Sequence, residues 1–138
     1  MLRNFIAVFL FFFAIVGYAD SSGSFFTDHK VQVPAEQAFR VNAVLESANI
    51  INISFNIMPG FYIYKDRLFI KSDNDQVFNQ DDIHLPSGFK MNVFNGESYA
   101  QEMVLNGSFN VKIALKHPTD ILGLSVHLQG CDGKTICY

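Results

Sequence analysis

Apolar and polar side chains alternate along three stretches of the chain, residues 51–57, 109–115 and 122–129. In the first stretch, isoleucine or phenylalanine occupies every odd position, and asparagine or serine occupies every even one. This period places one side of a strand in a core and the other side in solvent. The pattern therefore predicts three β-strands, each with a single buried face.

Four shorter apolar stretches are further strand candidates, at residues 39–45, 61–64, 68–71 and 103–105. Asn106-Gly107 has the composition of a two-residue hairpin turn and is expected to join two of the strands. No segment carries a sustained helical period. Many short strands separated by turn residues predict an all-β fold, an immunoglobulin-like antiparallel β-sandwich, with a small barrel as the alternative.

The first 19 residues have the features of a secretory signal peptide. Arg3 makes the leader positive, residues 5–16 are uninterruptedly apolar, and residues 17–19 include small side chains where a signal peptidase cleaves. The apolar run falls short of the roughly 20 residues that a transmembrane anchor needs. We therefore expect cleavage after Ala19 and export of residues 20–138 as one domain to an oxidising compartment such as the periplasm, where disulfides persist.

Charge and motif content narrow the classes of function. The formal net charge of the whole sequence is -3, and no run of lysine or arginine follows the expected signal peptide. Such a chain lacks the basic surface that binds a phosphate backbone, so nucleic acid is not an expected partner. No glycine-rich phosphate loop, catalytic serine set or carboxylate pair has convincing spacing, so hydrolytic or nucleotide chemistry has no support.

Metal and cofactor sites are also not expected. The four histidines are scattered, and His127 together with both cysteines would supply three of the four ligands of a structural zinc site. Residues 72–82 are rich in Asp, Asn and Gln, but their spacing matches no calcium-binding loop. We interpret that stretch as a solvated loop.

Cys131 and Cys137 are the only cysteines of the sequence. A bridge across so short a loop restricts the unfolded chain by roughly 2 kcal/mol, less than a long loop would. A purely structural role therefore explains the pair poorly, and redox exchange is a serious rival. Exchange needs a thiolate, a second thiol nearby and access for a partner, all of which a hairpin pair provides. Lys134 would favour a thiolate and Asp132 would oppose it, which leaves the thiol acidity open.

Several motifs of the chain resemble one known family. They are Val-Pro-Ala-Glu-Gln-Ala-Phe at residues 33–39, Pro-Gly-Phe-Tyr-Ile-Tyr-Lys at 59–65, Leu-Pro-x-Gly at 85–88, Gln-Gly-Cys at 129–131 and Cys-Tyr at 137–138. In order and spacing they are similar to the amino-terminal periplasmic domain of DsbD, the thiol:disulfide interchange protein. The resemblance extends through nearly all of the sequence after the expected signal peptide.

The resemblance implies an immunoglobulin-like domain that acts as a protein-disulfide reductase module through a Cys131–Cys137 dithiol or disulfide. It implies that a thioredoxin-like domain of the same protein, fed through a membrane domain, supplies the electrons. The implied recipients are periplasmic disulfide isomerases and thioredoxin-like proteins of cytochrome c maturation. By position, Cys137 corresponds to the sulfur that forms the mixed disulfide with partners, and Cys131 to the one that resolves it.

The same resemblance assigns three supporting residues. Phe94 matches an aromatic residue in a capping loop, expected between residues 88 and 96, that shields the disulfide, and Tyr62 and Tyr64 match an aromatic pair that borders the site. Ordinary packing is the alternative for each of the three. The acidic positions of the family's capping loop are Asn92 and Val93 here, so a proton-handling role for carboxylates in that loop does not carry over.

Family members continue beyond the Cys-Tyr motif with a further strand. We therefore expect this sequence to be truncated at its C-terminal strand and to be one module of a larger inner-membrane protein. Contact with the membrane would then come only through downstream domains. The alternative function is a secreted immunoglobulin-like binding module whose hairpin disulfide is purely structural.

Overall fold

A computed structural model describes residues 32–74, 77–118, 123–134 and 136–138. The expected signal peptide, the cleavage position after Ala19 and the start of the predicted domain lie outside the described residues. Residues Gln32–Tyr138 form one unit by their internal contacts. Within the described residues, no helix has the length and apolar character needed to cross a membrane.

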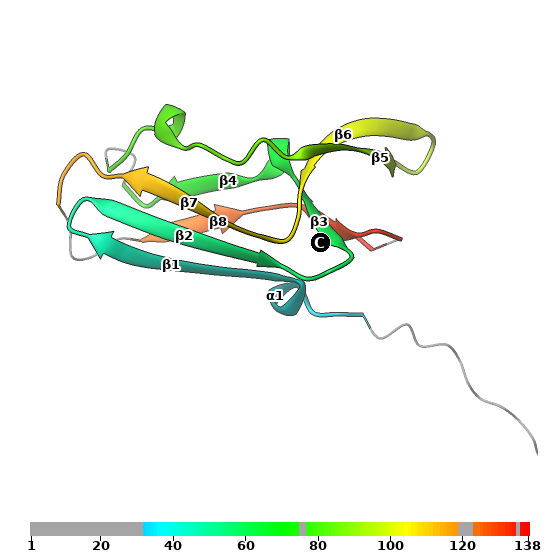
Figure 1. The fold of residues 1–138 in the computed structure, drawn as a ribbon, viewed down its shortest axis with the longest axis horizontal. Helices are drawn as coiled ribbons and strands as arrows, with labels where there is room; N and C mark the ends of the chain where they lie inside the picture. Colours follow the sequence, from blue (N-terminus) through cyan, green and yellow to red (C-terminus); the bar gives the residue numbers. More distant parts are fainter. Residues whose placement is uncertain (1–31, 75–76, 119–122, 135) are drawn as a thin grey trace, which may run out of the picture. The chain divides into compact units, whose positions relative to one another are not determined.

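The strands form antiparallel sheets in two layers (Figure 1). One sheet has the order β1-β2-β7, with β1 at Phe39–Ser47, β2 at Ile50–Ile57 and β7 at Ser108–Ala114. A second has the order β5-β6-β3-β9, with β5 at Phe89–Phe94, β6 at Tyr99–Leu105, β3 at Phe61–Tyr64 and β9 at Gly130–Asp132. In addition, β4 (Phe69–Ser72) pairs with β8 (Leu124–His127). Short helical turns lie at α1 (Ala35–Ala38), η1 (Lys65–Arg67) and η2 (Gln80–Asp82).

The β4–β8 and β3–β9 pairs follow one another along the same two chain segments. Between them, the backbone N–H of Tyr64 donates to the carbonyl of Gln129 at 3.0 Å. The two segments thus run side by side as one interrupted ladder from β4 and β8 to β3 and β9. This ladder carries β9, and with it Cys131, to one end of the sandwich.

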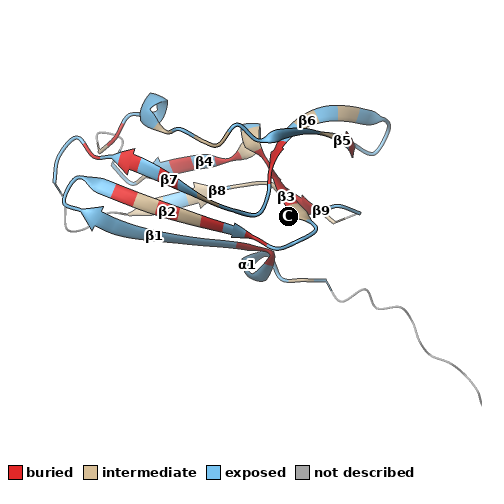
Figure 2. Cartoon of the chain, in the orientation of Figure 1, coloured by how far each residue is buried: buried red, intermediate tan, exposed pale blue. Residues whose placement is uncertain are grey.

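The main core lies between the layers and is built from alternating strand residues (Figure 2). On β2, Ile51, Ile53, Phe55 and Ile57 are all at most 2 % exposed, whereas the asparagine and serine residues between them are not buried. Burial of alternate residues is what the period-two pattern predicts for a strand with one covered face. The expectation of single buried faces is confirmed for this strand.

A second apolar cluster is the feature of the fold that positions a cysteine. Successive side chains of β3 point to opposite faces of the sheet, so Ile63 enters the main core while its neighbours Tyr62 and Tyr64 do not. The two tyrosines pack with Val93, Val104 and Cys131 in a separate buried cluster. Cys131 on β9 is thereby packed against side chains of β3, β5 and β6.

Most of the predicted strands are present, with ends shifted by a few residues. The stretch 122–129 is the main exception: residue 122 lies outside the described residues, β8 spans Leu124–His127, and the ladder is interrupted before β9 begins at Gly130. The stretch 103–105 is the end of the longer strand β6.

The prediction that Asn106-Gly107 forms a hairpin turn is wrong. The residues do connect β6 to β7, but β6 pairs with β5 and β3, whereas β7 pairs with β2 in the other sheet. Gly107 has a φ of 67° and its carbonyl accepts from the N–H of Ile57 at 2.9 Å. A glycine in the left-handed region serves a tight reversal between layers as well as it serves a hairpin.

The expected capping loop between residues 88 and 96 is largely a strand. Residues Phe89–Phe94 form β5, and the reversal into β6 is confined to the next few residues. There Asn95 Oδ1 accepts from the N–H groups of Glu97 at 3.0 Å and Ser98 at 2.9 Å. Met91 and Val93 pack toward the second cluster, so the alternation in this segment is that of a strand covering a small apolar patch.

Candidate active site

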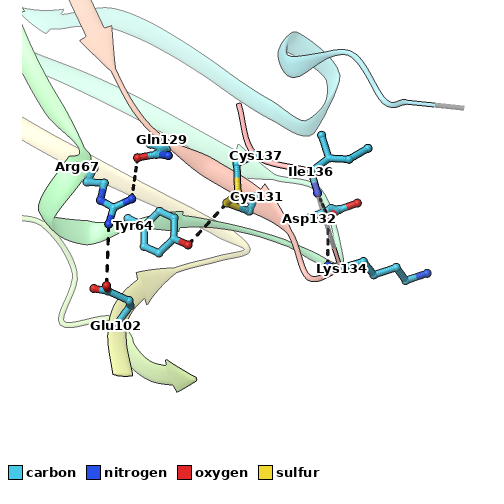
Figure 3. The surroundings of a disulfide bond; sticks show 9 residues. All are labelled: Tyr64, Arg67, Glu102, Gln129, Cys131, Asp132, Lys134, Ile136 and Cys137. Carbon is cyan, nitrogen blue, oxygen red and sulfur yellow. Dashed lines mark hydrogen bonds and ion pairs between the residues drawn. A yellow bond between two sulfur atoms is a disulfide. The ribbon is translucent and has the colours of Figure 1, made fainter. Parts of the chain in front are cut away.

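Cys131 and Cys137 form a disulfide between the two sides of a short hairpin (Figure 3). They face each other as an antiparallel bridge, and their Cα atoms lie 4.0 Å apart. On its other side, Cys131 in β9 is paired with Tyr62 in β3. The predicted site cysteines are therefore joined to each other and to the strand that carries both predicted tyrosines.

Hydrogen bonds close this hairpin independently of the sulfur–sulfur bond. The N–H of Asp132 donates to the carbonyl of Ile136 at 2.8 Å, and the N–H of Tyr138 donates to the carbonyl of Gly130 at 2.8 Å. The Asp132 carboxylate Oδ1 also accepts from the N–H groups of Lys134 at 3.1 Å and Ile136 at 2.8 Å. The side chain of Asp132 thus organises the tip of the hairpin.

The base of the hairpin is fixed to the start of β1. The Tyr138 hydroxyl donates to the carbonyl of Val33 at 2.6 Å, and its ring packs edge-on against Phe39 with centroids 5.6 Å apart. A Cβ atom added to Gly130 would lie 2.5 Å from two ring carbons of Phe39 and 2.8 Å from the carbonyl oxygen of Tyr62. Glycine at this position therefore allows the hairpin to approach β3 and Phe39 closely.

The two cysteines differ sharply in exposure. Cys131 is 2 % exposed within the second apolar cluster, whereas Cys137 is an exposed residue. A thiolate must approach a disulfide along the sulfur–sulfur axis from the side of the sulfur that it attacks. A thiol arriving from solvent consequently meets Cys137 first, and Cys131 lies on the protected side of the bond.

The hydroxyl of Tyr64 is a polar partner of the buried sulfur. It lies 3.7 Å from Cys131 Sγ and is the donor, because a disulfide sulfur carries no hydrogen. The rings of Tyr62 and Tyr64 meet edge to face with centroids 5.4 Å apart. Burial raises the pKa of Tyr62, and a hydrogen bond and charge from Tyr64 and the charge of Asp132 raise it further. Both tyrosines therefore pack in the sheet and line the site at once.

Arg67 contacts the ring of Tyr64 (Figure 3). Its guanidinium carbon lies 4.2 Å from the centroid of the Tyr64 ring. Nη1 donates to Gln129 Oε1 at 2.7 Å, and Nη2 lies 3.9 Å from Glu102 Oε1. No motif indicated that Arg67 and Glu102 belong to the site, because they lie in distant segments of the sequence and, unlike Tyr64 and Gln129, in none of the recognised motifs.

Two hollows flank the disulfide. The first, the cap groove, has a volume of about 450 Å³. The residues that line it are Tyr62, Met91, Asn92, Val93, Phe94, Gly96, Tyr99, Cys131, Asp132, Gly133, Lys134 and Cys137. The second, the arginine recess, has a volume of about 370 Å³. It is lined by Tyr64, Arg67, Val93, Phe94, Asn95, Glu102, Gln129 and Cys137.

Phe94 lines both hollows together with Cys137. Its side chain is 55 % exposed and contacts the ring of Tyr99, with centroids 5.3 Å apart. Val93, one position earlier, is the residue that enters the second cluster. Phe94 therefore stands at the mouth of the site and is not a core residue.

A further hollow of about 440 Å³ lies beside the polar stretch at residues 72–82. Asp81 and Asp82 line it, but neither cysteine does. Among the residues that the structure describes, no group of three or more His, Cys, Asp or Glu side chains is placed to hold a metal ion. The chemistry that the described geometry supports is centred on the two sulfur atoms.

The sequence of the chain is similar to that of one family of known proteins. The family model described as the N-terminal region of the thiol:disulfide interchange protein DsbD matches residues 30–138. The DsbD protein of Ralstonia nicotianae is 32 % identical over 110 residues, which are 77 % of this chain and 17 % of that protein. The DsbD protein of Colwellia psychrerythraea is 24 % identical over 118 residues, which are 86 % of this chain and 18 % of that protein. The chain thus spans about a fifth of the length of these relatives.

Two solved structures share the fold. The reduced N-terminal domain of Neisseria meningitidis DsbD aligns with a TM-score of 0.64 at 20 % identity, over 77 % of this chain and 81 % of that one. The complex of the DsbD and PilB N-terminal domains from the same organism aligns with a TM-score of 0.56 at 18 % identity, over 77 % and 79 %. The predicted immunoglobulin-like antiparallel fold is confirmed.

Proposed function

Because the chain belongs to the family of the N-terminal domain of the thiol:disulfide interchange protein DsbD, we propose that it is a periplasmic electron relay that works through Cys131 and Cys137. In this role it is a protein-disulfide reductase module. It takes two electrons from a thioredoxin-like dithiol and passes them to the disulfide of another protein. No cofactor takes part, since thiol–disulfide exchange needs only the sulfur atoms.

Loading begins from the disulfide form. A thiolate of the donor attacks Cys137 Sγ, the Cys131–Cys137 bond breaks, and its electron pair leaves with Cys131 as a thiolate. The second donor thiolate then attacks the donor sulfur that is bonded to Cys137 Sγ in the mixed disulfide, and Cys137 leaves as a thiolate. The donor ends as a disulfide and the module as a dithiol.

Delivery reverses the sequence with a different partner. The Cys137 thiolate attacks the partner disulfide and displaces one partner thiolate. Cys131 then attacks Cys137 Sγ, which displaces the second partner thiolate and restores the internal bridge. Two electrons pass to the partner, and the module returns to the form in which it began.

The difference in exposure between the cysteines is the observation that carries this proposal. The exposed Cys137 suits attack by and on large partners, while the buried Cys131, 2 % exposed, suits the intramolecular step. A purely structural role for the disulfide has less support, because backbone hydrogen bonds and those accepted by the Asp132 side chain already close the hairpin. A bridge across so short a loop also contributes only about 2 kcal/mol by loop entropy.

Partners and setting follow from the family. We propose that the donor is a thioredoxin-like domain of the same larger inner-membrane protein, and that the recipients are periplasmic disulfide isomerases and cytochrome c maturation proteins. The solved complex of the Neisseria domain with a PilB N-terminal domain supports a protein partner for this fold. Residues 1–19 would direct export, and residues 20–138 would form the module.

The test is thiol trapping of the purified chain in a series of glutathione buffers, followed by incubation with the thioredoxin-like domain of a DsbD protein. We expect a reduction potential above about -300 mV, whereas structural disulfides typically have potentials below that value. We also expect rapid exchange with the thioredoxin-like domain. A lower potential together with no exchange would favour the alternative, a binding module with a structural disulfide.

A further inference from the structure

The relay as described makes no use of Arg67, although this residue is tied to the site at three points. Its guanidinium covers the ring of Tyr64 at 4.2 Å, and the same group contacts Gln129 at 2.7 Å and Glu102 at 3.9 Å. All four of these residues line the arginine recess together with Cys137. A long side chain loses considerable rotamer freedom when it is held by three contacts, so an arginine without a role at the site would not be expected to adopt this conformation.

The contacts fix the direction of the guanidinium without cancelling its charge. The short bond goes to Gln129, a neutral acceptor, whereas the oxygen of Glu102 is 3.9 Å away and the side chains of Arg67 and Glu102 are 41 % and 30 % exposed. Water therefore screens the ion pair strongly. The cation remains free to interact with the ring face of Tyr64, which carries negative potential.

Tyr64 transmits this arrangement to the sulfur. Its hydroxyl donates to Cys131 Sγ across 3.7 Å, within a buried cluster where water does not compete. A hydrogen bond to a charged acceptor contributes more than one to a neutral acceptor. The contact should therefore strengthen as negative charge develops on Cys131.

We propose that Arg67 is a positioning residue, held by Gln129 and Glu102, that aims the Tyr64 hydroxyl at Cys131 Sγ and so speeds the departure of the Cys131 thiolate when the bridge is reduced. This inference rests on the redox function proposed above. The step that it assists is attack of an incoming thiolate on Cys137 Sγ, with the electron pair of the broken bond leaving on Cys131. Stabilising a leaving thiolate accelerates exchange.

The experiment measures the rate at which dithiothreitol reduces the bridge at fixed pH. Its small size removes any contribution from a protein interface. Four variants of the full chain are compared with the wild type: Tyr64→Phe, Arg67→Met, their combination, and Arg67→Lys. Lys112→Met is the matched control, since it removes the cation of an exposed ion pair, with Glu46 at 2.9 Å, in the other sheet.

Tyr64→Phe and Arg67→Met are each expected to slow reduction about threefold. This is a part of the full effect of one hydrogen bond to a charged acceptor, because the charge on Cys131 is only partly developed in the transition state. The double variant should be no slower than Tyr64→Phe, because Arg67 acts through that hydroxyl. Arg67→Lys should recover part of the rate, and Lys112→Met should match the wild type. A merely structural role predicts the opposite direction, since loosening the cluster exposes the bridge and speeds its reduction.

An unchanged rate for Arg67→Met would overturn the proposal, and so would equal slowing by Arg67→Met in the wild-type and Tyr64→Phe backgrounds. If Arg67→Met does not fold, the comparison of Tyr64→Phe with Arg67→Lys decides, because a wild-type rate in both contradicts the positioning role. Failure of the wild-type chain to exchange with a thioredoxin-like domain would instead contradict the proposed function.

Discussion

Cys131 and Cys137 face each other across one hairpin with their Cα atoms 4.0 Å apart, yet Cys131 is buried and Cys137 is exposed. The burial of Cys131 comes from its pairing with Tyr62 and from the apolar cluster that it forms with side chains of β3, β5 and β6. The fold thus gives chemically identical residues different access to solvent. This asymmetry is what a relay needs if one sulfur is to meet partners and the other is to resolve.

Because the hairpin packs closely on Phe39 and β3, Gly130→Ala is expected to lower the free energy of unfolding strongly. The added methyl group would collide with the Phe39 ring and with the carbonyl oxygen of Tyr62, a backbone atom. We expect a loss of about 1–3 kcal/mol in the free energy of unfolding, typical of overpacking, measured by urea denaturation of the oxidised chain. Gly133→Ala is the matched control, because its Cβ would meet one atom at an ordinary 3.4 Å. Equal losses in the two variants would contradict this account of Gly130.

The hairpin tip predicts that Asp132→Ala destabilises the chain more than Asp132→Asn does. Alanine removes the Oδ1 acceptor of the Lys134 and Ile136 N–H groups, whereas asparagine retains an acceptor at the same place. The expected loss for alanine is about 1–2 kcal/mol with the disulfide intact, again from urea denaturation. Identical stability of the two variants would show that the side chain does not organise the tip.

The place of Phe94 at the mouth of both hollows predicts that Phe94→Ala speeds reduction of the bridge by a small thiol. Loss of the ring opens the approach to Cys137, which lines the same two hollows. Phe69→Ala is the control, since Phe69 is 52 % exposed against 55 % for Phe94 but lies on β4. We expect a severalfold increase for Phe94→Ala alone. Equal rates in the two variants would mean that Phe94 does not shield the disulfide.

The raised pKa of Tyr62 predicts a loss of stability at alkaline pH. Burial favours the neutral phenol in the folded state. The stability that this difference contributes is complete below the pKa of the unfolded chain, about 10. It is lost as the pH rises from there toward the higher pKa of the folded state. Tyr62→Phe should flatten the decline in the free energy of unfolding above about pH 10. Tyr99→Phe, which removes a phenol that is 74 % exposed, serves as the control. An unchanged slope in Tyr62→Phe would contradict the prediction.

Sequence patterning identified the strands that cover the main core, because a face buried along a whole strand leaves a full alternation, as in β2. It missed β5, where only Met91 and Val93 pack against the small second cluster. It also misplaced Asn106-Gly107, because a tight turn does not reveal whether the next strand returns to the same sheet. Local composition specifies a reversal, and the choice of partner is a tertiary property.

The candidate site shows the same division. The spacing of the cysteines and the resemblance to a family indicate Cys131, Cys137, Tyr62, Tyr64 and Phe94 from the sequence alone. Arg67 and Glu102 had no such signal, because their contacts join residues far apart in the sequence. The exposure of each cysteine was equally hidden, since it depends on the register of β9 against β3.

The most direct test of the relay compares two single-cysteine variants, Cys131→Ser and Cys137→Ser. Each is mixed with a DsbD thioredoxin-like domain that keeps one active-site cysteine, activated as a thionitrobenzoate disulfide, and release of the thionitrobenzoate anion is followed. We predict that Cys131→Ser, which retains the exposed Cys137, forms the mixed disulfide at least about tenfold faster than Cys137→Ser, because thiol reactivity follows access. Equal rates, or a faster reaction through the buried Cys131, would contradict the account.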